Sequence, residues 1–191
     1  YLVCLGQDDE SALARTQFAQ ADNMTDRMGA LAPLVHAGGM PQPELAQFYD
    51  MFKHEPLALD KWFMIQATIP ASNEQVDVIS HIQTLLKHPD FNLKNPNRAR
   101  SVLAAFAMQN PSVFHHHSGA GYSLWADLVI ELNAINPQVA ARMARALDRW
   151  TKLEPHLQNK AQAALERILS QNGLSADVRE VVSKALGAVT H

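Results

Sequence analysis

The chain has 191 residues, of which 47% are hydrophobic and 18% are charged. This composition is typical of a globular protein with a sizeable core, and it excludes intrinsic disorder. The net charge of −3 argues against a dedicated nucleic-acid-binding protein, because such proteins are normally basic. No apolar run approaches the roughly 20 residues that a membrane-spanning helix needs, so we expect no membrane partner.

Charge is unevenly distributed along the chain. Residues 1–97 carry six Lys and Arg against twelve Asp and Glu, whereas residues 98–191 carry ten against seven. The second half could face a ligand that bears a carboxylate, although ordinary scatter of surface charge is the simpler explanation. The single cysteine, Cys4, cannot form an internal disulfide and is typical of a reducing compartment, so we expect a cytoplasmic location.

Apolar residues recur with the helical period along almost the whole chain. The first stripe covers residues 24–35, where Pro33 is expected to bend or shorten the helix. Residues 57–69 are apolar on most faces and are expected to be fully buried, with the charges of Asp60 and Lys61 paired or reaching the surface. The other stripes, each typical of an amphipathic helix, cover residues 45–52, 76–86, 99–107, 125–132, 139–150, 157–168 and 178–186.

Two helix starts of the same kind lie 41 residues apart, at Asn95-Pro96 and Asn136-Pro137. Pro fits the first helical turn, and the preceding Asn can cap it. A period of this length is typical of helix-pair solenoids of the HEAT or armadillo kind. No convincing strand pattern occurs, and short connections make consecutive helices antiparallel neighbours. We therefore predict an all-α superhelical stack of antiparallel helix pairs that forms one domain over residues 1–191.

Three consecutive histidines, His115, His116 and His117, are the obvious candidates for a metal site. Three consecutive side chains point in different directions on any regular backbone, so they rarely bind one ion together. We expect an exposed polar turn before Ser118, and a metal site remains the less favoured alternative.

The signatures of catalysis are missing from the sequence. His54-Glu55 begins like the helix of a zinc peptidase, but Pro56 follows, and Ala58 stands where the second His is required. Cys4 lies near the start of the chain, and no Gly-x-Ser-x-Gly elbow occurs. We expect no catalytic residues and no metal ligands in this chain.

An arginine stripe is the most distinctive polar feature. On a helix that begins near Pro137, residues Gln138, Arg142, Arg145 and Arg149 fall on one face, opposite the apolar stripe. A solvated helix face is the simpler interpretation. The functional interpretation is a groove that receives a carboxylate or peptide carbonyls, because Arg can donate two hydrogen bonds at once.

Several short motifs also occur in a distinctive order. They are Ala21-Asp22-Asn23-Met24-Thr25-Asp26, Asp60-Lys61-Trp62-Phe63, Asn95-Pro96-Asn97-Arg98, Gly119-Ala120-Gly121-Tyr122 and Asn136-Pro137-Gln138-Val139-Ala140. Over about residues 12–188 this ordered set resembles the C-terminal domain of the bacterial aminopeptidase N family, the alanyl aminopeptidases of the gluzincin class.

The resemblance implies a fold, a partner and a site. It implies an all-α superhelix that packs against an upstream catalytic domain carrying zinc, and that encloses a cavity admitting peptide substrates but not folded proteins. It places Arg100, Gln138 and Arg142 at the border of that cavity. The zinc ligands and catalytic groups belong to upstream domains in this family, so this chain alone is expected to bind no zinc and to be inactive.

A free-standing helical-repeat scaffold that binds a protein or peptide on its concave face is the alternative. Such a scaffold should have polar capping helices at both ends. A domain cut from a larger enzyme should instead expose an apolar patch where its neighbour packed. The apolar segment at residues 1–5, which begins with Tyr1 rather than Met, favours a piece of a longer protein.

Overall fold

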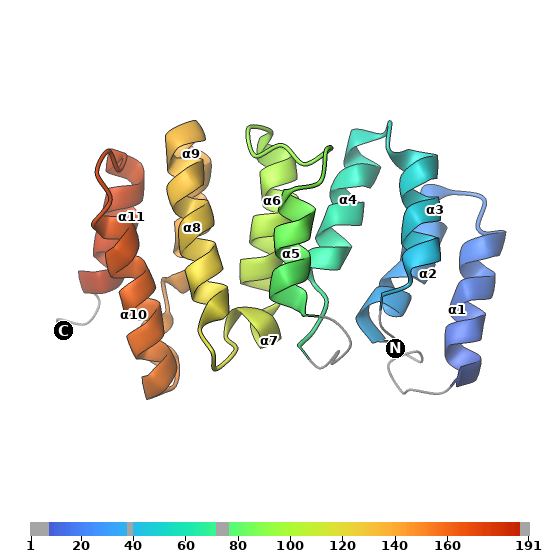
Figure 1. Cartoon of the computed structure of the whole chain (residues 1–191), viewed down its shortest axis with the longest axis horizontal. Coiled ribbons are helices and arrows are strands. Elements are labelled where there is room, and N and C mark those ends of the chain that lie inside the picture. Colours follow the sequence, from blue (N-terminus) through green and yellow to red (C-terminus); the bar gives the residue numbers. More distant parts are fainter. Residues whose placement is uncertain (1–7, 38–39, 72–76, 188–191) are drawn as a thin grey trace.

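The computed structural model describes residues 8–37, 40–71 and 77–187, and all the regular structure in these ranges is helical. Figure 1 shows the helices standing side by side in a row, from α1 (blue) at one end to α10 and α11 (orange and red) at the other. The α-helices are α1 (Asp8–Gln20), α2 (Met24–Ala37), α3 (Gln42–Phe52), α4 (Pro56–Ala67), α5 (Val78–Leu86), α6 (Pro96–Ala104), α7 (Pro111–Phe114), α8 (Ala120–Ile135), α9 (Pro137–Ala144), α10 (Pro155–Leu169) and α11 (Ala176–Gly187). A π-helical turn, η2 (Ala105–Gln109), follows α6, and two 3-10 turns, η3 (Arg145–Leu147) and η4 (Trp150–Lys152), follow α9.

The helices stack as pairs in two layers. The pairs are α1 with α2, α3 with α4, α5 with α6, α8 with α9, and α10 with α11, and the two members of each pair are in contact. We call α2, α4, α6, α9 and α11 layer A, in which each helix contacts the next. We call α3, α5, α8 and α10 layer B, in which α8 contacts both α5 and α10. The predicted all-α stack of antiparallel helix pairs is confirmed.

The predicted repeat corresponds to two neighbouring helices of layer A. The Asn95 side chain accepts hydrogen bonds from the amides of Asn97 at 3.0 Å and Arg98 at 3.4 Å, and so caps α6. The Asn136 side chain accepts one from the amide of Val139 at 3.2 Å and caps α9. Both caps satisfy amides that the first helical turn would leave unpaired.

Several hydrogen bonds between successive pairs keep a similar period. Their partners are 40 to 43 residues apart in sequence, which is the length of one helix pair with its connections: Tyr49 with Asp90, Asn110 with Ile69, Ala71 with Ser112, Lys160 with His117, Arg167 with Asp127, and Ser175 with Asn133. The spacing of the two Asn-Pro starts therefore reflects a structural repeat that extends beyond α6 and α9.

Two tryptophans tie the helices within a pair. The indole N–H of Trp62 on α4 donates to the carbonyl of Leu45 on α3 at 2.9 Å. The indole N–H of Trp125 on α8 donates to the carbonyl of Met143 on α9 at 3.0 Å. A large ring is thus buried while its polar group is satisfied, as a buried Trp requires.

A buried arginine links α4 to α6. Arg98 is 6% exposed, and its Nε lies 2.5 Å from a carboxylate oxygen of Asp60. Its guanidinium also donates to the carbonyl of Asp90 and lies 5.0 Å from the centre of the Phe63 ring. The expectation that Asp60 and Lys61 are paired or reach the surface is confirmed, since Asp60 is paired and Lys61 is exposed.

Two expectations about helices are corrected by the structure. Helix α2 continues past Pro33 to Ala37, so of the two expected effects of this proline, a bend or a shortening, the shortening is wrong. Residues 57–69 are not fully buried, because Leu57 is 71% exposed and Met64 is 36% exposed. These two side chains lie on the face of α4 that no neighbouring helix covers. The segment is apolar on most faces, so its sequence does not show which face is exposed. Val76 of the expected stripe lies outside the described residues.

Burial acts on several histidines. It lowers the pKa of His36, His88 and His115, and it lowers the pKa of His81 to about 4. The Nε2 atom of His81 is buried and has no hydrogen-bond partner among the described residues. Desolvation therefore disfavours the charged ring, and the folded state keeps His81 neutral.

Replacing Arg98 should destabilise the fold far more than replacing its neighbour. We expect Arg98→Ala to lower the free energy of unfolding by about 3 kcal/mol, because the Asp60 carboxylate then stays largely buried without its partner. Arg100→Ala on the same helix should change it by less than about 0.5 kcal/mol, because among the described residues the Arg100 side chain bonds only within α6. Urea denaturation of both variants measures the difference, and equal losses would contradict the role given to Arg98.

Stability should fall as the pH drops from 6.5 towards 4. In this range an unfolded chain protonates His81 while the folded chain does not, so the stability present above pH 6.5 is lost progressively. We expect His81→Leu to reduce this slope by roughly 1 kcal/mol per pH unit. The control is His54→Leu, a change at an exposed site. Urea midpoints measured at several pH values test this, and an unchanged slope in His81→Leu would refute it.

Candidate functional site

A polar groove runs between α9 and α11 of layer A. It has a volume of about 520 Å³ and is lined by Gln138, Ala141, Arg142 and Arg145 on one side and by Asp177, Glu180 and Val181 on the other. The α9 side follows from helical spacing, because residues at i, i+4 and i+7 share a face. The opposite, apolar face of α9 packs inward through Ala140, Met143 and Ala144.

The predicted arginine stripe is three residues long in the structure rather than four. Helix α9 ends at Ala144, and the chain continues as a 3-10 turn over Arg145–Leu147. The tighter turn breaks the 3.6-residue period, so Arg149 does not line the groove. Including Arg149 in the stripe was therefore wrong, whereas Gln138, Arg142 and Arg145 do share one surface.

Arg100 lies on the neighbouring layer A helix rather than in the groove. Its Nε donates to the carbonyl of Pro96 at 3.1 Å, and its terminal nitrogen donates to the side chain of Asn97. Helix α6 contacts α9, so Arg100 and the groove belong to adjacent helices of one layer. The structure thus brings Gln138 and Arg142 together and leaves Arg100 outside the groove that they line.

The acidic wall of the groove was missed by the sequence analysis. Asp177 and Glu180 come from α11 and line the same groove as Arg142 of α9 and Arg145 of η3. A hydrogen bond from Lys184, at 2.5 Å, is the main cause that holds the pKa of Glu180 below its ordinary value. The spacing of Asp177, Glu180 and Lys184 at i, i+3 and i+7 was a signal for this wall, although it resembles any charged helix face.

The three histidines point to different partners. His115 lies 2.8 Å from the Tyr122 hydroxyl, and His116 lies 3.0 Å from the Ser118 hydroxyl. The His117 ring is tilted against that of His116, with 4.1 Å between their centres. Burial raises the pKa of Tyr122 to about 12 and lowers that of His115. The expected exposed turn is correct for His116 and His117, whereas His115 is half-buried.

Two glycines shape the chain after this turn. Gly119 has a φ of 76°, a conformation that other residues rarely adopt, and precedes α8. A Cβ on Gly121 would lie 2.5 Å from the carbonyl oxygen of Phe114, so only glycine lets α8 approach α7 this closely. These requirements give the Gly119-Ala120-Gly121 motif a structural role.

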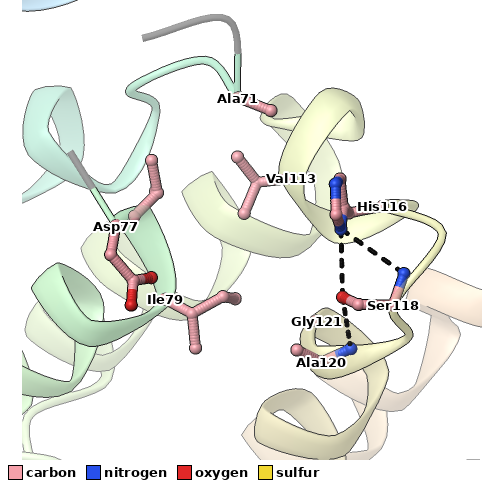
Figure 2. Close-up of a pocket in the computed structure, with 9 residues that line it drawn as sticks. Ala71, Asp77, Ile79, Val113, His116, Ser118, Ala120 and Gly121 are labelled. Carbon is pink, nitrogen blue, oxygen red and sulfur yellow. Dashed lines mark hydrogen bonds between the residues drawn. The ribbon is translucent and has the colours of Figure 1, made fainter. Parts of the chain in front are cut away.

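A small cleft lies beside the same turn (Figure 2). Its volume is about 150 Å³, and it is lined by residues of three segments: Ala71, then Asp77, Val78 and Ile79 at the start of α5, and Val113, His116, Ser118, Ala120 and Gly121 around the turn. Figure 2 shows His116 and Ser118 hydrogen-bonded to each other on one side of the cleft, with the Asp77 carboxylate on the other. That carboxylate caps α5 through Ser80, so its position has a structural cause.

The described residues do not fit a metal. Within residues 8–37, 40–71 and 77–187, no group of three His, Cys, Asp or Glu side chains is arranged to hold an ion. In the same part of the chain, no helix is long and apolar enough to cross a membrane.

The paired helices, their repeat of about 40 residues and the polar groove on layer A define a helical-repeat domain of the armadillo type. The model of one such family, the domain of unknown function DUF3458_C with ARM repeats, matches residues 1–187. The chain therefore belongs to this family.

The relatives found by sequence and by structure are aminopeptidases. The chain is 43% identical over 171 residues to aminopeptidase N of Caulobacter vibrioides, and 41% identical over 175 residues to that of Escherichia coli. These matches cover 89% and 91% of this chain but only 19% and 20% of the relatives. A crystal structure of Legionella pneumophila aminopeptidase A in complex with aspartic acid matches with a TM-score of 0.86 and 32% identity, over 95% of this chain and 21% of that one.

The resemblance to the C-terminal domain of the aminopeptidase N family is thereby confirmed. The chain spans about a fifth of the length of these relatives, and the region that it matches is their C-terminal part.

Proposed function

We propose that this chain is the cavity-closing, substrate-access domain of a zinc aminopeptidase that removes N-terminal residues from peptides. The observation that carries the proposal is the identity of 43% to an aminopeptidase N over 89% of the chain. The TM-score of 0.86 to an aminopeptidase supports it independently of sequence motifs. In this proposal the partner is the upstream catalytic domain of the same protein, the substrates are peptides, and the enzyme acts in the cytoplasm.

The catalytic groups and the zinc ion belong, in this proposal, to the upstream domain. The described residues of this chain offer no set of ligands for zinc, and its candidate site is built from arginines and carboxylates. The domain would act on the reaction by positioning the substrate, which lowers the barrier by orientation rather than by making bonds.

Arg100, Gln138 and Arg142 are the residues that we assign to peptide positioning. Gln138 and Arg142 are exposed on the wall of the groove, and Arg100 is half-buried on the adjacent helix. The Arg142 guanidinium makes no hydrogen bond or ion pair with the described residues, so it is available to a carboxylate or a peptide carbonyl. Such a bond would be charge-assisted and, with a carboxylate, bidentate.

The separate roles of this chain and of the upstream catalytic domain can be tested by mixing the two fragments. We expect this purified chain, alone or with zinc, not to hydrolyse alanyl-para-nitroanilide, and we expect activity to rise above that of the upstream fragment when both are mixed. A chain carrying Arg98→Ala, which we expect to fold poorly, is the control for specific docking. A mixture no more active than the upstream fragment alone would contradict the proposal and favour a free-standing scaffold that binds a protein partner.

Loss of Arg142 should affect peptides more than small chromogenic substrates. In the full-length enzyme we expect Arg142→Ala to lower kcat/KM for a tetrapeptide roughly three- to fivefold, because an ion pair at an exposed site contributes up to about 1 kcal/mol. Hydrolysis of alanyl-para-nitroanilide, which does not extend to the groove, should change little. Arg149→Ala, outside the groove, is the matched control. Unchanged tetrapeptide kinetics in Arg142→Ala would rule out the positioning role.

A further inference from the structure

The groove between α9 and α11 holds one unpaired positive charge and one unpaired negative charge on facing walls. The Asp177 side chain on α11, like that of Arg142 on α9, makes no hydrogen bond or ion pair with the described residues. Both residues are exposed, and both line the same volume of about 520 Å³. Opposite charges that lie in one groove without pairing leave room for a ligand between them.

The other charges of the groove are already engaged. Glu180 is paired with Lys184 at 2.5 Å, one helical turn along α11. Arg145 lies 4.0 Å from Asp148 across the 3-10 turn η3, and its charge also acts on Glu180. The charges left for a ligand are therefore Arg142 and Asp177, one of each sign.

A ligand that matches this pair carries both a carboxylate and a cation. The C-terminal residue of a peptide meets that requirement when its side chain is basic, because the α-carboxylate and the side-chain cation belong to one residue. A peptide that ends in an uncharged residue engages Arg142 alone, and one that ends in Glu or Asp meets repulsion from Asp177.

We propose that Asp177 is a specificity-determining residue that receives the basic side chain of peptides ending in Lys or Arg. This inference rests on the proposed aminopeptidase function and adds a preference at the far end of the substrate. Asp177 is exposed, so its contribution is that of a solvent-accessible ion pair. We expect a preference of roughly two- to fivefold in kcat/KM, which such a pair supports.

The test compares tetrapeptides that differ only in their last residue. The full-length enzyme is given Ala-Ala-Ala-Lys, Ala-Ala-Ala-Ala and Ala-Ala-Ala-Glu at low ionic strength, and kcat/KM is measured for each. Asp177→Asn should abolish the preference for the Lys peptide, measured as the ratio of kcat/KM for the Lys peptide to that for the Ala peptide. Asp177→Lys should reverse the order, so that the Glu peptide is preferred. Glu131→Gln, an exposed carboxylate on layer B, is the control and should keep the native order.

The possible outcomes distinguish a failure of this inference from a failure of the proposed aminopeptidase function. If the native enzyme cleaves none of the peptides, the proposed aminopeptidase function fails. If it cleaves them with the same ratio in the native enzyme, Asp177→Asn and Asp177→Lys, the function stands and the role of Asp177 is refuted. The Ala peptide reports any general damage to α11, because Asp177 also lies in the first turn of that helix.

Discussion

The buried ion pair between Arg98 and Asp60 is the constraint on which the stack depends. Helix pairs in a solenoid touch only their neighbours, so each junction must fix the next pair by itself. At the junction of α4 and α6 a single guanidinium contacts a carboxylate on α4, the carbonyl of Asp90 before α6, and the face of Phe63. Tyr49 on α3 donates to the Asp90 carboxylate, which also raises the pKa of the tyrosine. Because these bonds are directional, they set the angle of α6, whereas apolar packing alone would tolerate sliding.

The position of the groove depends on that junction through successive contacts between helices. Helix α6 contacts α9, and α9 contacts α11, so the two walls are placed by successive packing within layer A. Trp125 holds α8 to α9, and the Trp150 indole donates to the carbonyl of Ala185 on α11 at 3.0 Å. A hydrogen bond from a buried indole thus holds each of the two helices that form the walls. The exposed side chains of the groove take no part in these hydrogen bonds. The charges in the groove are therefore free to differ without loss of the fold.

The sequence predicted the helices, their pairing and the repeat because these depend on local periodicity and capping, which a single chain displays. It could not distinguish Arg98 from Arg100, since two arginines two residues apart look alike until the partner helix shows which one is buried. Arg149 was misplaced because the change from α-helix to 3-10 turn at Arg145 leaves no mark on the apolar pattern. The α11 wall was missed because tertiary packing determines which helix faces lie opposite each other. In the sequence alone, a charged stripe is indistinguishable from an ordinary solvated face.

A groove with charges of both signs is consistent with the proposed role in positioning peptides. A wall of arginines alone would bind any anion and would release it slowly. Facing charges of opposite sign instead favour a ligand with one arrangement of carboxylate and cation. Since these side chains are exposed, water screens each interaction, and the contribution of any single pair stays near or below about 1 kcal/mol. Discrimination then rests on the geometry of two weak contacts rather than on one strong one. If the proposed function holds, such a site would favour some peptides over others without binding any of them tightly.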